Sequence, residues 1–449
     1  MRTAAMSVWI FINLVCFGMC GYLYLIWSQY WMYLEKQKYL NKPTPATIQK
    51  STISFSFEPV HFDFGLKNDS RKNRRSAVGV LWNVRSSDTQ TQSSVVIKRL
   101  GSPRFPNTHK TVLELDSKKF VCDDISDADC DTKSKQFKQL ILKEFHRILM
   151  TDSNVFISGI DSQNPYNVKY ERGLSGERRE SSGNEILCSL RKILVKTVTA
   201  SDEPFASEGF RIPPNILQGN KTFDTCAVVT SAGALLGSGL GPFIDSHAMV
   251  LRFNNAPTEN YTEDVGSKTT FRILNSQVVV KPEYNFPKHH LFSEASILVW
   301  DPSNYLSSLE DWYRHSDFPL FPVYKRLLDE RPDADVHLLR PDVLWKLWTI
   351  LQDESPYRLR RNPPSSGFIG IWFALHRCNR VRVFEYVPSA RATRRCHYHS
   401  VRNDSGCTLG AWHPLAQEKA VAERIRDNTD IQVFQLGYID IPGFQTIHC

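Results

Sequence analysis

Residues Cys226–Ser276 decide the fold of this chain, and they read CAVVTSAGALLGSGLGPFIDSHAMVLRFNNAPTENYTEDVGSKTTFRILNS. The stretch holds three short runs of apolar or β-branched residues, Cys226–Val229, Ala248–Phe253 and Thr269–Leu274. Each run ends in polar residues or glycine, a pattern typical of buried strands. Because α/β sheets bind ligands outside the ends of their strands, we expect functional groups where these runs end.

Strand and helix patterns continue to alternate along the chain from Glu185 onward. Further strands are predicted over Ile297–Trp300, Val336–Leu339 and Val381–Tyr386, and helices over Val343–Gln352, Gly367–His376 and Pro414–Arg426. This alternation predicts an α/β sheet flanked by helices. The glycines between Gly233 and Gly241 do not follow the G-x-G-x-x-G spacing, so the sequence does not support a dinucleotide-binding fingerprint.

The N-terminal part has a different character. Val8–Trp27 is almost wholly apolar and is long enough to cross a bilayer as a helix. A cleaved signal peptide is the alternative, but its apolar region would usually be shorter and followed by a small-residue cleavage site. Polar residues dominate up to residue 134, and an amphipathic helix is predicted over Ser134–Met150. We therefore expect a cytoplasmic tail (1–7), a transmembrane signal-anchor (8–27), a stem (28–134) and one folded domain (135–449).

Cysteines and glycosylation sequons indicate that this domain is lumenal. Ten cysteines are present, and eight remain after Cys16 and Cys20 of the N-terminal apolar run are set aside. None forms a C-x-x-C pair, and an even number suits an oxidising compartment. Sequons begin at Asn68, Asn220, Asn260 and Asn403. Together these features predict a type II membrane protein.

The charge pattern narrows the class of ligand. The formal net charge is +8, and basic residues are spread along the chain without a recognisable nucleic-acid-binding module. An anionic small substrate is therefore a better interpretation than nucleic acid. Two Asp-x-Asp triplets, Asp127–Asp129 and Asp333–Asp335, are interpreted as solvated turns, so no metal site is predicted from them.

Two further stretches carry candidate ligand-binding or catalytic groups. Ser365, Ser366 and Gly367 follow two prolines and precede an apolar helix, whose free N–H groups would attract phosphate or carboxylate. A simply capped helix is the ordinary alternative. His413 precedes a proline at a predicted helix start, where a histidine is usually structural, yet histidine is also a good general base near neutral pH.

The segment Cys396-His397-Tyr398-His399 places two histidines on alternate positions. A metal pair is conceivable, but no third ligand is indicated nearby. The more ordinary interpretation is a disulfide-tied loop, with Cys407 as the nearest partner.

These stretches together resemble the four sialyl motifs of the eukaryotic sialyltransferases. Cys226–Ser276 is similar to the long motif, Ser365–Cys378 with Val383–Pro388 to the short motif, Cys396–Ser400 to the third motif and His413-x4-Glu418 to the very short motif. The resemblance covers roughly Glu185 to Cys449. The ending Pro442–Cys449 most closely resembles the beta-galactoside alpha-2,6 branch of that family.

The resemblance implies a single catalytic domain of the GT-A-like, Rossmann-type α/β class that works without a metal. It implies transfer of sialic acid from CMP-sialic acid to the 6-hydroxyl of terminal galactose or N-acetylgalactosamine on glycoprotein glycans, with inversion. His413 would be the general base, with Glu418 supporting its motif. The donor side would comprise Ser231, Asn254, Asn275, Ser365, Ser366, Gly367, His397, Thr408, Trp412 and Lys419.

Some residues depart from the family pattern, and other details remain open. His397, His399 and Trp412 stand where relatives tend to have tyrosine. The resemblance also implies disulfides Cys226–Cys378, Cys396–Cys407 and Cys188–Cys449, and residence in the Golgi membrane with the catalytic domain lumenal. The position of Tyr305–Leu351 between the two large motifs predicts a contribution to the acceptor side. The sequence leaves open whether Cys122 pairs with Cys130 to close a small local loop.

Two alternative functions stay open at this stage. One is a sialyltransferase of alpha-2,3 or alpha-2,8 linkage. The other is a membrane-anchored glycan-binding protein that has lost catalysis. The sequence leaves open the choice between galactose and N-acetylgalactosamine, the class of glycoconjugate and the oligomeric state, with a homodimer as one alternative.

Overall fold

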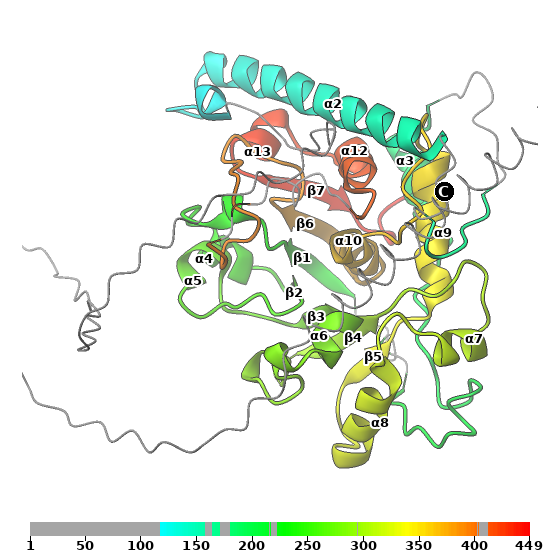
Figure 1. Ribbon diagram of the computed structural model, residues 1–449. Coiled ribbons are helices and arrows are strands. Elements are labelled where there is room, and N and C mark those ends of the chain that lie inside the picture. Colours follow the sequence, from blue (N-terminus) through cyan, green and yellow to red (C-terminus); the bar gives the residue numbers. More distant parts are fainter. Residues whose placement is uncertain are drawn as a thin grey trace, which may run out of the picture. The chain divides into compact units, whose positions relative to one another are not determined.

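The computed structural model describes residues 117–157, 164–170, 180–214, 216, 222–293, 295–401, 403 and 412–449 (Figure 1). The expected cytoplasmic tail, signal-anchor and most of the stem lie outside these residues, as do Asn68, Asn220, Cys407 and Thr408. Within the described residues, no helix combines the length and the apolarity needed to cross a membrane.

A seven-stranded sheet forms the centre of the fold. Its order is β5 (Val336–Leu338), β4 (Ser296–Trp300), β3 (Phe271–Asn275), β2 (Met249–Phe253), β1 (Phe223–Val229), β6 (Cys378–Phe384) and β7 (Tyr438–Pro442). All neighbouring strands are parallel except β6 and β7, which are antiparallel. The six strands predicted from the sequence are all present, and the mixed α/β sheet is the expected class.

Strand β7 was not predicted from the sequence. Its residues alternate in character, but Asp440 interrupts the apolar pattern. In the structure the Asp440 carboxylate accepts two hydrogen bonds from the Arg382 guanidinium of β6, at 2.7 and 2.9 Å. Asp440 can be buried in β7 because the neighbouring strand supplies its hydrogen-bond partner. An apolar pattern alone therefore does not reveal this strand.

The helices lie on both faces of the sheet. On one face are α2 (Ala128–Ile157), α3 (Gly183–Arg191), α9 (Pro341–Asp353), α10 (Ser366–Arg377) and α12 (Leu415–Ile425), which share a core with inward residues of the strands. The other face carries α4 (Gly241–Asp245), α5 (Thr262–Val265), α6 (Ser276–Val280), α7 (Leu309–Arg314) and α8 (Leu320–Glu330). Because the strands are buried on both faces, their sequences are nearly continuous apolar runs.

Short elements complete the order. They are η1 (Ser117–Phe120), η3 (Gly233–Leu235), η4 (Pro282–Tyr284), η5 (His290–Phe292) and α13 (Asp430–Phe434). Figure 1 shows α13 near the β7 end of the sheet and α8 near the β5 end.

The folded part extends further toward the N-terminus than the boundary at residue 135 that the sequence predicted. Phe120 packs against Phe137, with ring centroids 5.3 Å apart. The amide of Cys122 donates to the Gln435 side chain at 3.1 Å. The predicted helix Ser134–Met150 lies within the longer α2, whose first turn carries Asp129 and so suits the positive end of the helix dipole.

Disulfides fasten distant segments of this fold. Cys226 of β1 is bonded to Cys378 of β6, and Cys188 of α3 is bonded to the terminal Cys449. These are two of the three pairs that the resemblance implied, and Cys122–Cys130 is also formed. Cys396 is disulfide-bonded as well, and its expected pairing with Cys407 stays a prediction because Cys407 lies outside the described residues. The separation of 152 residues between Cys226 and Cys378 corresponds to roughly 5 kcal/mol of loop-closure entropy.

Candidate active site

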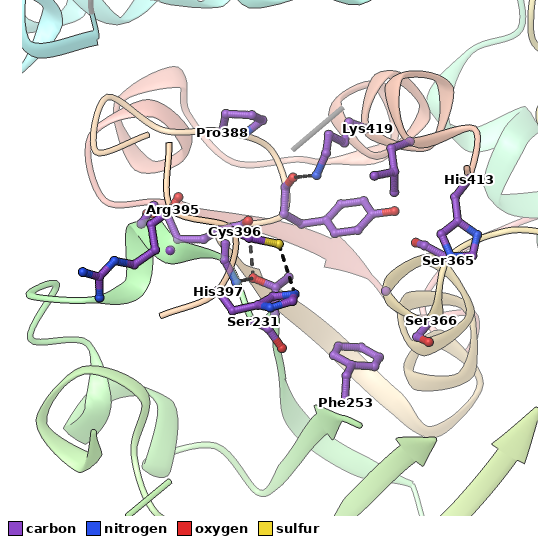
Figure 2. Close-up of a pocket in the computed structure, with 18 of the residues that line it drawn as sticks. Ser231, Phe253, Ser365, Ser366, Pro388, Arg395, Cys396, His397, His413 and Lys419 are labelled. Carbon is purple, nitrogen blue, oxygen red and sulfur yellow. Dashed lines mark hydrogen bonds between the residues drawn. The ribbon is translucent and has the colours of Figure 1, made fainter. Parts of the chain in front are cut away.

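A pocket of about 280 Å³ lies where β1, β2 and β3 end and α10 begins (Figure 2). The sequence-predicted residues that line it are Ser231, Asn254, Asn275, Ser365, Ser366, Gly367, His397, His413 and Lys419. Trp412 adjoins His413 but is not part of the lining, and its side chain is 40% exposed. The structure thus brings four separate sequence motifs to one cavity.

Two asparagines form the wall of the pocket at the ends of β2 and β3. Asn254 adopts a left-handed backbone conformation, with φ of 48°, which asparagine tolerates better than most residues. Its Oδ1 accepts from the amide of Asn275 at 3.1 Å, and Asn275 Oδ1 accepts from the amide of Val278 at the start of α6 at 3.1 Å. Because both amide oxygens are engaged, the side-chain NH₂ groups are the atoms suited to donate to a ligand.

The turn Ser365–Gly367 forms another wall at the N-terminus of α10. Ser365 is the N-cap, and its Oγ accepts from the Phe368 amide at 3.2 Å. Ser366 Oγ accepts from Trp300 Nε1 at 2.9 Å. A Cβ atom at Gly367 would lie 2.8 Å from Cε2 of Tyr386, so a larger residue would displace the turn. The positive end of the α10 dipole therefore faces the pocket through a closely packed turn.

Glu418 holds this turn in place from α12. Its side chain is fully buried. Oε1 accepts from the Ser365 amide at 2.8 Å, while Oε2 accepts from Ser365 Oγ at 2.5 Å and from the Tyr386 hydroxyl at 2.8 Å. The pKa of Tyr386 is raised well above its usual value, mainly by burial and next by the nearby charge of Glu418. Glu418 is therefore a positioning residue for the turn, consistent with its place in the motif.

Lys419 brings a cationic group to the pocket. Its Nζ donates to the Tyr386 carbonyl at 2.5 Å, and only 7% of the residue is exposed. Burial lowers the pKa of Lys419 to about 8. The ammonium group is thus mostly charged at neutral pH and suits an anionic ligand.

The geometry of His413 defines its tautomer. Its Nδ1 lies 2.8 Å from the carbonyl oxygen of Pro363, which can only accept a hydrogen bond. Nδ1 must therefore carry the proton, so in the neutral ring Nε2 presents a lone pair. Burial lowers the pKa of His413, although Glu418 and the Pro363 carbonyl oppose this shift. Figure 2 shows His413 beside the turn formed by Ser365 and Ser366.

The third motif lies on another side of the pocket, where His397 lies beside Ser231 (Figure 2). The backbone of His397 pairs with Ala232, and the rings of His397 and His399 are parallel, with centroids 5.3 Å apart. Desolvation lowers the pKa of both, that of His399 to about 4. The described residues include no cluster of three His, Cys, Asp or Glu side chains arranged to hold a metal ion.

Sequence reasoning missed a polar and aromatic cluster beside Trp412. The Tyr166 hydroxyl donates to Asp317 Oδ1 at 3.3 Å, and the rings of Tyr166 and Trp412 meet edge to face with centroids 6.2 Å apart. Burial raises the pKa of Asp317. Asp317 lies within the segment expected on the acceptor side, but no motif marks either residue. Only the fold brings Tyr166 and Asp317 together.

The part of the chain that forms this site is similar to known proteins. A family model described as glycosyltransferase family 29 (sialyltransferase) matches residues 194–429. The chain is 45% identical over 277 residues to the beta-galactoside alpha-2,6-sialyltransferase 2 of Xenopus tropicalis, covering 60% of this chain and 53% of that protein. It is 42% identical over 287 residues to the protein of the same name from Bos taurus, covering 62% and 58% respectively.

The matched part therefore spans little more than half the length of these curated relatives. Among solved structures, a mammalian sialyltransferase in complex with Gal-beta-1-3GalNAc-ortho-nitrophenol matches at 22% identity and a TM-score of 0.32, covering 56% of this chain and 78% of that chain.

Proposed function

The chain belongs to glycosyltransferase family 29, the sialyltransferases, and we propose that it transfers sialic acid from CMP-sialic acid to the 6-hydroxyl of a terminal galactose or N-acetylgalactosamine. The observation that carries this proposal is His413, whose Nδ1 is bonded to the Pro363 carbonyl, so that Nε2 is free to act as a base at the pocket. The alpha-2,6 linkage is the one named in the two relatives at 42–45% identity.

The donor is proposed to bind with its anionic groups toward the cationic features of the pocket. CMP-sialic acid carries a phosphate and a carboxylate. Lys419, the N-terminus of α10 and the side-chain amides of Asn254 and Asn275 are suited to meet these charges. Fixed donors of this kind stabilise a leaving phosphate without reorganisation, so we propose a metal-independent reaction on a GT-A-like fold.

The chemical step uses the lone pair on Nε2 of the neutral His413 ring. Nε2 takes the proton from the 6-hydroxyl of the acceptor as that oxygen forms a bond to the anomeric carbon of sialic acid. The bond from the anomeric carbon to the phosphate oxygen breaks, and CMP leaves with the bonding electrons. Attack opposite the leaving group inverts the anomeric centre. The proton then rests on the imidazole, whose charge the buried Glu418 favours.

The acceptor is proposed to bind on the Trp412 side of the pocket. The hydroxyl of Tyr166 and the carboxylate of Asp317 offer hydrogen-bonding groups there, and Trp412 offers an exposed aromatic ring. Aromatic rings with a few convergent polar groups are typical of a specific small-molecule site.

We further propose that residues 8–27 anchor the chain in the Golgi membrane as a type II protein with a lumenal catalytic domain. The disulfides Cys226–Cys378 and Cys188–Cys449 support an oxidising compartment. The boundary of the folded domain is then placed before η1 rather than at residue 135, because η1 and the Cys122–Cys130 loop pack with it.

The test is transfer by the full-length protein in detergent, with a chelator present. The acceptors are disaccharides ending in galactose or in N-acetylgalactosamine, and linkage-specific sialidases identify the product. Chelator-resistant formation of an alpha-2,6 product would support the proposal and identify the preferred acceptor. An alpha-2,3 or alpha-2,8 product would favour another linkage. Binding of CMP without transfer to either acceptor would favour a glycan-binding protein without catalytic activity.

A further inference from the structure

A second cavity, also of about 280 Å³, lies between the loop that follows β2 and the segment that carries η4 and η5. From the first side it is lined by Asn255, Pro257 and Glu259–Tyr261, and from the second by residues 283–284 and 289–292. The same loop begins with Asn254, which lines the donor pocket. One loop therefore contributes residues to both cavities.

Asn260 stands at this second cavity and begins the sequon Asn260-Tyr261-Thr262. It is exposed and occupies a turn closed by a 3.0 Å hydrogen bond from the Tyr261 amide to the Thr258 carbonyl. Its φ of 67° is in the left-handed region that asparagine accommodates in turns. The side-chain nitrogen is thus accessible on an exposed loop, the position at which N-linked sugars are found.

The lining of this cavity suits a neutral sugar ring. Tyr261 and Tyr284 supply aromatic surfaces, and Glu259 and Glu283 supply carboxylates that accept from hydroxyl or amide groups. His289 Nδ1 accepts from the Leu291 amide at 3.3 Å, so in the neutral ring Nε2 carries a proton that can be donated. Two carboxylates disfavour an anionic sugar such as sialic acid.

We propose that Asn260 is N-glycosylated and that the first N-acetylglucosamine of its glycan occupies this cavity, bridging the loop after β2 to residues 282–292. The proposal rests on the lumenal location in the proposed function. In the covalent step, Asn260 Nδ2 bonds to the anomeric carbon of a lipid-diphosphate-linked oligosaccharide. The bond to the diphosphate oxygen breaks, the lipid diphosphate leaves with the electron pair, and the amide proton passes to a base of the transferring enzyme.

The bridge would brace the wall of the donor pocket. Tyr398, between the two histidines of the third motif, donates its hydroxyl to the Pro257 carbonyl at 2.5 Å. Buried Arg272 donates to the Asn254 and Ala256 carbonyls at 2.8 and 3.1 Å. The inner side of the loop is thus held by protein groups, and the sugar would hold the outer side.

The test uses the full-length chain expressed in mammalian cells. Glycopeptide mass spectrometry measures occupancy of Asn260, and hydrogen exchange measures protection of residues 282–292. We expect Asn260 to be occupied, and these amides to exchange several-fold faster in Asn260→Gln. Thr262→Ala should reproduce this effect because it destroys the sequon, whereas the matched variant Thr262→Ser keeps the sequon and should leave both measurements unchanged.

Two further measurements locate the sugar. Endoglycosidase H leaves the first N-acetylglucosamine attached, so trimming high-mannose protein with it should preserve the protection; loss of protection would contradict the placement of that sugar. In a Tyr284→Ala background, Asn260→Gln should no longer change exchange at residues 282–292. An unchanged effect in that background would also contradict the placement.

An unoccupied Asn260 beside an occupied Asn403 would overturn this proposal alone, as would an occupied Asn260 whose removal leaves exchange unchanged. If none of the four sequons is occupied, both this proposal and the lumenal location fail. Sialic acid transfer is assayed on the same samples. Absent transfer with the expected occupancy and exchange would count against the proposed activity and leave the sugar site supported.

Discussion

Glu418 and Ser365 are joined by two hydrogen bonds, from the Ser365 amide to Oε1 at 2.8 Å and from the Ser365 hydroxyl to Oε2 at 2.5 Å. The pair links the first turn of α12 to the N-terminus of α10. His413 precedes α12 and Ser365–Gly367 lies at the start of α10, so one buried contact links the helix that follows the proposed general base to the proposed donor turn.

Glu418→Gln should weaken donor binding while leaving His413 in place. The amide can replace only part of the acceptor capacity that Glu418 offers to Ser365 and Tyr386. Hydrogen bonds to a charged group contribute on the order of 2 kcal/mol, so we expect about a 30-fold weaker affinity for CMP. Calorimetric titration measures this. Glu423→Gln on the same helix is the control, and equal losses in the two variants would contradict a specific role for Glu418.

The rate of transfer should remain high below the ordinary pKa of histidine. Burial lowers the pKa of His413 from 6.5, so the neutral, base-competent ring persists as the pH falls below 6.5. The same shift means that His413 contributes stability above its unfolded pKa, which is lost as the pH falls toward its folded pKa. The pH dependence of kcat/KM for wild-type protein should show its acidic limb below 6.5. A limb above 6.5 would contradict this assignment of the base.

Donor affinity should decline in alkaline solution because of Lys419. Its pKa of about 8 in the free pocket means that its charge is lost above that pH. We expect the KM for the donor to rise above pH 8 in wild-type protein, and Lys419→Met to have a raised KM at pH 7 that changes little with further alkalinity. A KM that is the same at pH 7 and pH 9 in wild-type protein would argue against contact between Lys419 and the donor.

Removing the Cys226–Cys378 disulfide by a double substitution to alanine should lower the free energy of unfolding more than removing Cys122–Cys130 in the same way. The loops have sequence separations of 152 and 8 residues, which correspond to roughly 5 and roughly 2.5 kcal/mol of closure entropy. Denaturant unfolding of the two double variants measures the difference. Equal losses would contradict the entropic account.

The strands and the lining of the pocket could be predicted because their signals are contiguous. Strand β2 (Met249–Phe253) is buried along its whole length, so every residue in it is apolar except Arg252, whose guanidinium donates to backbone carbonyls. Asn254 and Asn275 directly follow predicted strands, and Ser365 lies two residues before the predicted helix Gly367–His376, which explains why they meet at one edge of the sheet. Their positions are observed, whereas their roles toward the donor remain predictions.

Contacts between segments far apart in the chain could not be predicted from the sequence. The Arg382–Asp440 pair completes β7 and joins residues that no local pattern relates. Tyr166 and Asp317 meet beside Trp412 in the same way. The double contact of Glu418 with Ser365 also depends on the packing of α12 against the start of α10, which a motif spacing cannot convey.

The central claim is that His413 is the base that accepts the proton of the 6-hydroxyl. The most direct measurement is the single-turnover rate of sialic acid transfer by full-length wild-type protein and His413→Ala, each saturated with donor, together with the affinity of each for CMP. We predict a loss of about 10²- to 10⁴-fold in rate, the usual contribution of a positioned base, with CMP affinity changed less than threefold. An unchanged rate in His413→Ala would contradict the account.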